Sequence, residues 1–176
     1  MYINFWYPVC LSLEIKEGPK KATILGLDFV AFRDHKGTAH CLSNICVHRG
    51  GSLAQGICHD DGTIACPYHG WRFDGAGRCQ KIPSLGPDSK VPKRAKIDSY
   101  PVQERYGIVF AFLGDQSEKE RPELYEIEEF GAEGWRGNDP KVIDIDYNYE
   151  RSIENGLDPA HNEFVHPTHG HEGEDD

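Results

Sequence analysis

Two short cysteine–histidine pairs constrain this 176-residue chain more than any other feature of its sequence. The pairs are Cys46-Val47-His48 and Cys66-Pro67-Tyr68-His69, and 17 residues, 49–65, lie between them. Two thiolates and two imidazoles can bind either one tetrahedral metal ion or a two-iron cluster. Glycines accompany both pairs, and they let backbone N–H groups approach a buried, negatively charged centre. We therefore expect two tight loops that hold a common metal centre.

Up to residue 113 the sequence has the pattern of a mostly antiparallel β domain. Alternating and β-branched residues stand between Gly, Asp, Asn and Pro, which is typical of short strands. We expect the last two strands to form a hairpin at Arg105-Tyr106. The expected strands are residues 5–15, 23–27, 29–33, 39–42, 64–65, 71–73, 97–104 and 107–113.

The charge of the chain changes sign near Gly114. Residues 1–113 contain 14 basic and 10 acidic side chains, whereas residues 114–176 contain 5 and 19. We interpret residues 114–140, in which acids are interrupted by Pro and Gly, as a solvated acidic linker with one short helix. Residues 141–176 would then begin a second domain, with a strand over 142–149 and a helix over 150–165.

The two loops resemble those of the Rieske iron–sulfur family, whose [2Fe–2S] centre has cysteine ligands on one iron and histidine ligands on the other. The resemblance covers residues 5–113 and is strongest at residues 46–50 and 66–71. It implies that Cys46 and Cys66 hold the inner iron and that His48 and His69 hold the outer iron. The implied fold is mostly β: a Rieske-type antiparallel β domain (1–113) with two cluster-binding loops, followed by the truncated start of an α+β catalytic domain.

Three positions differ from the respiratory branch of that family. Respiratory Rieske proteins have an additional cysteine in each loop and join the loops by a disulfide, whereas Gly51 and Tyr68 stand at those places here. Trp71 stands where the respiratory type has a serine, whose hydroxyl would hydrogen-bond a sulfide and raise the potential. These differences favour the lower-potential oxygenase and ferredoxin branch.

A single structural zinc ion bound by the same four residues is the alternative, although C-x-H is shorter than the usual spacing of zinc cysteines. The remaining cysteines are expected to be free thiols, because the N-terminus lacks a secretory signal and the compartment is expected to be reducing. They are Cys10, Cys41, Cys58 and Cys79.

A second group of metal-binding side chains is formed by Asp158, His161 and His166. In a continuous helix Asp158 and His161 would share a face, and the Pro167 boundary would turn His166 back toward the same point. Two histidines with an acid suit a non-haem iron(II) site with open coordination positions. A surface helix that carries two histidines is the alternative on geometry alone.

Downstream of a Rieske pattern, this motif resembles the catalytic domain of Rieske non-haem iron oxygenases, the ring-hydroxylating oxygenase α subunits. The resemblance implies that His161 and His166 bind the mononuclear iron. It also implies that Asp158 bridges to His69 of a neighbouring subunit in a homotrimer and gates electron transfer. The sequence over residues 154–161 is most similar to the branch of O-demethylases and pheophorbide or chlorophyllide oxygenases.

The third iron ligand of that family, a downstream Asp, has no counterpart before Asp176. Residues 168–176 contain histidines and acids, but their spacing marks none of them as this ligand, and we expect a solvated end. We therefore expect the chain to be a fragment, a truncated product or half of a split enzyme. Its 36 residues from 141 to 176 are too few to fold well by themselves.

The resemblance implies an oxygenase component that takes NAD(P)H electrons from a reductase, with or without a ferredoxin. The electrons would pass through the [2Fe–2S] cluster to a mononuclear Fe(II). The implied reaction is O2-dependent hydroxylation or oxidative demethylation of a small organic, aromatic substrate. A stand-alone Rieske electron-transfer protein is the alternative, although a pure carrier has no use for Asp158, His161 and His166.

Composition disfavours two classes of partner. A net charge of −10 argues against nucleic acid. The longest apolar run, residues 108–113, is much shorter than the roughly 20 residues that a membrane-spanning helix needs. With neither a membrane span nor a secretory signal, we expect the protein to be cytoplasmic.

Overall fold

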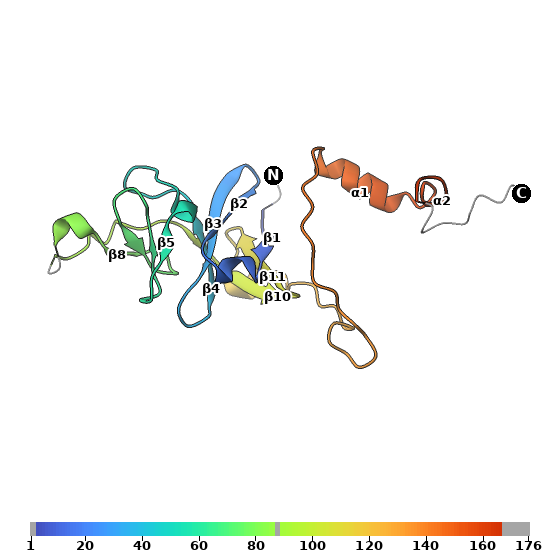
Figure 1. Cartoon of the computed structure of the whole chain (residues 1–176), viewed down its shortest axis with the longest axis horizontal. Coiled ribbons are helices and arrows are strands. Elements are labelled where there is room, and N and C mark those ends of the chain that lie inside the picture. Colours follow the sequence, from blue (N-terminus) through green and yellow to red (C-terminus); the bar gives the residue numbers. More distant parts are fainter. Residues whose placement is uncertain (1–2, 87–88, 167–176) are drawn as a thin grey trace, which may run out of the picture. The chain divides into compact units, whose positions relative to one another are not determined.

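The computed structural model describes residues 3–86 and 89–166, and the chain divides into two compact units. The first unit is Met1–Pro140 and the second is Lys141–Asp176. Short strands build the first unit, and the second unit contains two helices (Figure 1). No helix of the described residues is long and apolar enough to cross a membrane.

The first unit contains two larger antiparallel sheets, which we call the base sheets. One has the strand order β1-β11-β10, and the other has the order β2-β3-β4-β9. Their strands are β1 (Phe5–Leu11), β2 (Lys20–Ile24), β3 (Leu27–Arg33), β4 (Ala39–Ser43), β9 (Ser99–Tyr100), β10 (Val102–Arg105) and β11 (Ile108–Leu113). Strands β10 and β11 form the expected hairpin, whose turn residues Tyr106 and Gly107 both have positive φ, 57° and 74°. The mostly antiparallel β fold is therefore confirmed.

A third, smaller antiparallel sheet carries the second cysteine–histidine loop. Its strands follow one another in the order β5 (Ile57–Cys58), β6 (Ile64–Ala65), β7 (Arg72–Phe73) and β8 (Cys79–Lys81) (Figure 1). The connections between strands include the 3-10 turns η1 (Glu14–Lys16), η2 (Leu53–Gln55) and η3 (Pro83–Leu85), and a fourth 3-10 turn, η4 (Glu118–Glu120), follows β11. One core cluster joins this sheet to β3 and β4 and contains Phe32, Leu42, Leu53, Ile64 and Phe73. Burial of these side chains fixes the small sheet against the base sheet that contains β3 and β4.

Three expected strands differ in the structure. Residues 97–104 are divided between β9 and β10, which belong to different sheets. The other two are residues 5–15 and 142–149. The first ends at Leu11, and the 3-10 turn η1 follows it instead of a continuation to residue 15. Residues 142–149 do not form a strand, and Val142, Ile143, Ile145 and Tyr147 are exposed. Alternating apolar residues mark one face of a strand, but a strand also needs a hydrogen-bonded neighbour. None of the described segments pairs with residues 142–149.

The second unit contains two helices in place of the single expected one. Helix α1 (Tyr149–Leu157) begins at the N-cap Asn148, whose side chain accepts a hydrogen bond from the Glu150 N–H, and ends at Asp158. Helix α2 (Asn162–Val165) begins after His161. Pro159 explains the interruption, because it disfavours helical backbone at the residue before it and has no N–H to donate. Asp158 accordingly has φ −102° and ψ 94°.

The acidic segment 114–140 is exposed yet belongs to the first unit. The Trp6 Nε1–H donates to the Pro122 carbonyl over 2.8 Å, and the Tyr106 hydroxyl accepts from the Ile127 N–H over 2.6 Å and donates to the Tyr125 carbonyl over 3.1 Å. The ring of Phe130 lies edge-on to Tyr106, with centroids 4.8 Å apart. Hydrogen bonds and one ring contact thus tie this segment to the β domain.

Candidate functional site

The two cysteine–histidine loops have the same backbone design. Each loop has six residues, 46–51 and 66–71, and each is closed by an antiparallel pair, Ile45 with Ser52 and Ala65 with Arg72. In each loop the first residue donates its N–H to the carbonyl of the sixth, over 2.9 Å and 2.8 Å. The fifth residue, Gly50 or Gly70, donates to the carbonyl of the first over 2.8 Å and 2.9 Å. Both glycines have a positive φ, 72° and 68°, which favours glycine.

The cysteines of the two loops meet in the interior. Cys46 and Cys66 are both 2% exposed and belong to the core cluster of the small sheet. Their thiols hydrogen-bond each other, and the N–H groups of His48 and Arg49 point at the Cys46 sulfur. Burial raises the pKa of Cys46 to about 11. A nearby cation is therefore needed to stabilise the thiolate, and donated N–H groups support the negative charge.

The histidines of the two loops meet at the surface. The imidazoles of His48 and His69 lie with ring centroids 4.6 Å apart, and His69 is exposed. The Trp71 indole stacks on the His48 ring, with centroids 4.5 Å apart and planes inclined by 4°. His48 Nδ1 is buried without a hydrogen-bond partner among the described residues. Desolvation, with the positive charges of His69 and Arg49, lowers the pKa of His48, so its ring favours the neutral, metal-binding form.

Close contact between the loops depends on Gly51. A Cβ at this position would lie 2.9 Å from Cys66 Sγ and 3.4 Å from Tyr68 Cβ, so a side chain would press on the ligand of the other loop. Sequence reasoning gave Gly51 as a residue that lets the backbone approach the metal centre and as the place of an absent cysteine, but it did not predict the close approach to Cys66. It also missed Asn44, which is buried and shapes the first loop through hydrogen bonds with Ser52 Oγ and the Ala54 N–H. Its place two residues before Cys46 was the available signal.

The four residues fit a two-iron centre. Thiols face each other on the buried side, and imidazoles face each other on the exposed side. This division matches one iron with sulfur ligands and one with nitrogen ligands. Among the described residues, no three His, Cys, Asp or Glu side chains are grouped so that they could hold a single metal ion.

The second predicted group lies within the second unit and lines one hollow. Asp158, His161 and His166 border a cavity of about 480 Å³ together with Tyr147, Arg151, Asn155 and Val165. The His161 and His166 ring centroids are 5.4 Å apart, and Asp158 Oδ2 lies 3.8 Å from His161 Nδ1. That nitrogen is buried and accepts or donates no hydrogen bond within the described part of the chain. Asp158, His161 and His166 therefore line one cavity, but among the described residues they are not grouped closely enough to bind one metal ion.

The geometry of this second group differs from the expected helical face. Asp158 lies in extended backbone outside both helices, where its Oδ1 accepts from the Ala160 N–H over 3.0 Å. His161 and His166 flank helix α2 at its two ends. Asp158 and His161, which are i and i+3 in the sequence, therefore lie close together across the break at Pro159 and not on one face of a continuous helix. Residues 167–176, which include Pro167 and the expected solvated end, lie outside the described residues.

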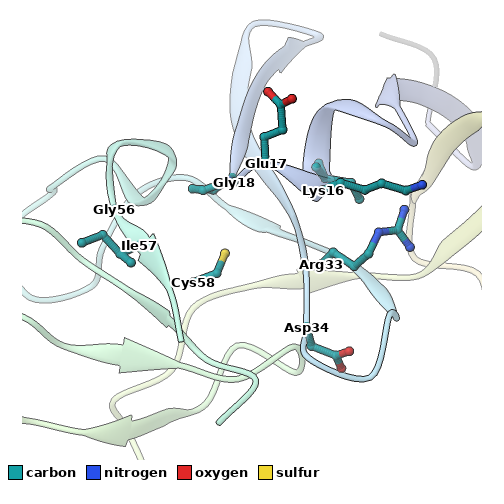
Figure 2. Close-up of a pocket in the computed structure, with 10 residues that line it drawn as sticks. Lys16, Glu17, Gly18, Arg33, Asp34, Gly56, Ile57 and Cys58 are labelled. Atoms are coloured by element: carbon teal, nitrogen blue, oxygen red, sulfur yellow. The ribbon is translucent and has the colours of Figure 1, made fainter. Parts of the chain in front are cut away.

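Another hollow, of about 510 Å³, lies apart from the predicted ligands (Figure 2). Lys16, Arg33, Asp34 and Cys58 contribute to its lining. The Arg33 guanidinium is already engaged, because it binds Glu104 and the carbonyls of Gly37 and Ser12. None of the six cysteines, all of which lie among the described residues, forms a disulfide, and Cys10, Cys41 and Cys79 are buried.

Comparison with known proteins identifies the first unit. The Rieske [2Fe–2S] domain family matches residues 5–101, which is more than half of the chain. The chain belongs to this family. The resemblance expected from the loop motifs is thereby confirmed.

The relatives of this Rieske protein include oxygenase components. It is 38% identical over 163 residues to the tert-butanol monooxygenase / tert-amyl alcohol desaturase oxygenase subunit of Aquincola tertiaricarbonis, covering 93% of this chain and 34% of the relative. It is 34% identical to the oxygenase component of 3-ketosteroid-9-alpha-monooxygenase from Rhodococcus rhodochrous, covering 92% of this chain and 43% of the relative. The chain therefore spans less than half the length of these relatives.

Solved structures of an oxygenase, dicamba monooxygenase, are also similar to this protein. Dicamba monooxygenase bound to dicamba aligns with a TM-score of 0.78 and 29% identity over 93% of this chain and 48% of that enzyme. A structure of dicamba monooxygenase with non-haem iron and dicamba aligns with a TM-score of 0.60 and 33% identity, covering 69% of this chain and 37% of that one. The fold of this Rieske protein is thus that of Rieske oxygenases.

Proposed function

We propose that this protein is the Rieske part of an oxygenase, in which electrons from a reductase reach a mononuclear non-haem iron for O2-dependent hydroxylation or oxidative demethylation. The substrate class would be a small organic, aromatic compound, and NAD(P)H would supply the electrons through the reductase, with or without a ferredoxin. The observation that carries the proposal is the paired arrangement of thiols inside and imidazoles outside.

The four residues of the first site form two pairs of ligands in this proposal. Cys46 and Cys66 would hold the inner iron, and His48 and His69 would hold the outer iron. When bound, a [2Fe–2S] centre accepts and releases one electron at a time, and its histidine ligands raise its potential above that of an all-cysteine centre. The exposed His69 leaves one edge of the site open to a partner, and the buried cysteines exclude water from the other edge.

The second group would bind the catalytic iron. His161 and His166 would be ligands, and Asp158 would bridge to His69 of a neighbouring subunit in a homotrimer and gate electron transfer. The shared cavity supports this assignment, as does His161 Nδ1, which is buried without a hydrogen bond among the described residues. The proposal further includes a third iron ligand and a substrate pocket in a longer form of the protein. It also includes a cytoplasmic location.

Metal and sulfide analysis tests the cluster. We expect protein purified without oxygen to be red-brown, with two irons and two inorganic sulfides per chain, and to give the EPR signal of mixed histidine and cysteine ligation after reduction. His69→Asn should abolish this signal, while His59→Asn, which changes a histidine outside both loops, should leave it intact. Zinc without sulfide would instead establish the structural zinc site.

Iron titration tests the second group separately. The cluster-loaded chain is mixed with Fe(II), and nitric oxide is used as an EPR probe of a mononuclear iron. A signal lost in His161→Ala and His166→Ala but kept in His171→Ala would support the oxygenase. A loaded cluster without any such signal in this chain or in a longer form of the protein would favour the stand-alone electron carrier.

A further inference from the structure

A basic segment stands out in this acidic protein. Residues 78–96 contain six basic residues and one acidic residue, a net charge of +5 within a chain of net charge −10. We call the six basic residues the basic rim, and all of them are exposed: Arg78, Lys81, Lys90, Lys93, Arg94 and Lys96. The rim is the strongest concentration of positive charge in the sequence.

The basic rim differs from other cations of the first unit in its ion pairing among the described residues. No member forms an ion pair with another described residue, whereas Lys21, Arg33 and Arg72 of the same unit each bind a carboxylate. Arg78 and Lys96 even lie opposite each other in an antiparallel bridge. Like charges opposite one another on paired strands are destabilising. The fold thus keeps this positive surface at a cost to its own stability.

One end of the basic rim, at Lys81, lies beside the second cysteine–histidine loop. Lys81 on β8 lies opposite Arg72 on β7, and Arg72 directly follows the second loop. Two residues after Lys81, Pro83 packs on that loop, since a Cβ on Gly70 would lie 3.1 Å from Pro83 Cγ. Gly70 adjoins the exposed His69. A protein that binds the rim and contacts Lys81 would therefore reach the histidine side of the site.

The rim also encloses a hollow. Arg78, Lys93 and Lys96 border a cavity of about 390 Å³ whose lining includes the apolar side chains of Val91 and Ala95. Cations around an apolar floor suit a carboxylate side chain that inserts from a partner. A small anion would need only the hollow, whereas six cations spread over 19 residues suit an extended acidic surface.

We propose that the basic rim is the docking surface for an acidic electron-transfer protein that reduces the cluster. The inference rests on the proposed function, because it presupposes a cluster that is reduced by a partner. Opposite charge on the two surfaces accelerates their encounter and orients the partner toward His69. Screening by salt weakens such steering, so the reaction must slow as ionic strength rises.

The test measures reduction of the cluster by a pre-reduced, acidic plant-type [2Fe–2S] ferredoxin in a stopped-flow instrument. The rim variant is R78Q/K93Q/K96Q. A control with the same loss of charge, K16Q/K36Q/K119Q, changes three exposed lysines outside the rim. Cluster content, reduction by dithionite and the urea denaturation midpoint are recorded for every protein.

At about 0.01 M NaCl, where the Debye length is about 30 Å, we expect the second-order rate constant of the rim variant to fall roughly tenfold or more. The control should stay within about twofold of the wild type, and the difference should shrink at about 0.15 M NaCl. Equal rates in the wild type and the rim variant, including no reaction with either, would overturn the docking surface. So would an equal loss in the control. A chain without iron and sulfide would instead overturn the proposed function.

Discussion

The indole of Trp71 lies flat on the imidazole of His48, with ring centroids 4.5 Å apart and planes inclined by 4°. Trp71 is half-buried and packs against the core cluster that contains Cys46 and Cys66. Its carbonyl also accepts from the Cys66 N–H over 2.8 Å. One residue thus positions an expected iron ligand of the first loop through its ring and the second loop through its backbone.

Replacement of Trp71 should loosen His48 while the backbone bond to Cys66 remains. We expect Trp71→Ala to destabilise the protein by roughly 2 kcal/mol, less than the ~3–5 kcal/mol of a fully buried Trp. We also expect the EPR signal of the reduced cluster to shift and broaden, with Trp71→Phe close to wild type. Trp135→Ala is the control, because Trp135 is 66% exposed. An unchanged EPR spectrum in Trp71→Ala would remove the positioning role.

A methyl group on Gly51 should interfere with cluster loading. It would lie 2.9 Å from Cys66 Sγ, and neither loop can shift freely because antiparallel pairs close both. We expect Gly51→Ala to hold less than about half of the wild-type iron and sulfide, as measured colorimetrically. Gly50→Ala is the matched comparison: its φ of 72° predicts a loss of about 1–2 kcal/mol in stability, but its Cβ meets nothing within 4 Å. Full loading in both variants would show that the loops adapt.

The sequence predicted the loops because their chemistry is local. Cysteine, histidine and glycine within six residues restrict a loop strongly, so Cys46, His48, Cys66 and His69 could be named before any fold was known. The contact of Trp71 with His48 could not be predicted, since it joins two loops whose relative position depends on long-range packing. Asn44 was missed for the same reason, because its partner Ser52 is eight residues away.

The second unit shows where pattern reasoning fails. We expected one helix over 150–165, but the single residue Pro159 changes the backbone of Asp158 and ends helix α1 at Leu157. Alternation at 142–149 predicted a strand, and alternation alone contains no information on whether a neighbouring strand exists. The first error overlooked a proline inside the predicted helix, whereas the second concerns a neighbouring strand that alternation cannot reveal.

The ion pair between Arg33 and Glu104 predicts a specific pH dependence. Arg33 on β3 binds both carboxylate oxygens of Glu104 on β10, over 2.7 Å and 3.0 Å, and so joins the two base sheets. The hydrogen bonds from Arg33 hold the pKa of Glu104 below its ordinary value of 4.5. Its stabilising effect is therefore complete above that pH and is lost as the pH falls through the lowered pKa of the folded state.

Glu104→Gln should remove this dependence. At pH 7 we expect it to lower the free energy of unfolding by about 1 kcal/mol or less, because the Glu104 side chain is 37% exposed. The difference from wild type should shrink as the pH falls below about 4. We measure this difference by thermal denaturation from pH 3 to 7. The proteins compared are the wild type, Glu104→Gln and, as a control, the exposed Glu126→Gln. A difference that stays constant with pH would assign the loss to packing instead of charge.

The Tyr106 hydroxyl should protect the acidic segment from proteolysis. It donates to the Tyr125 carbonyl and accepts from the Ile127 N–H, and these are bonds that Tyr106→Phe removes without changing the ring contact with Phe130. We expect a glutamate-specific protease to cut this variant after Glu123, Glu126, Glu128 and Glu129 several times faster than the wild type, because a released segment opens more often. Tyr125→Phe is the matched control, since Tyr125 is 79% exposed and contributes its carbonyl to this contact. If both variants are cut at the wild-type rate, the hydroxyl does not hold the segment, and the contacts of Trp6 and Phe130 must suffice.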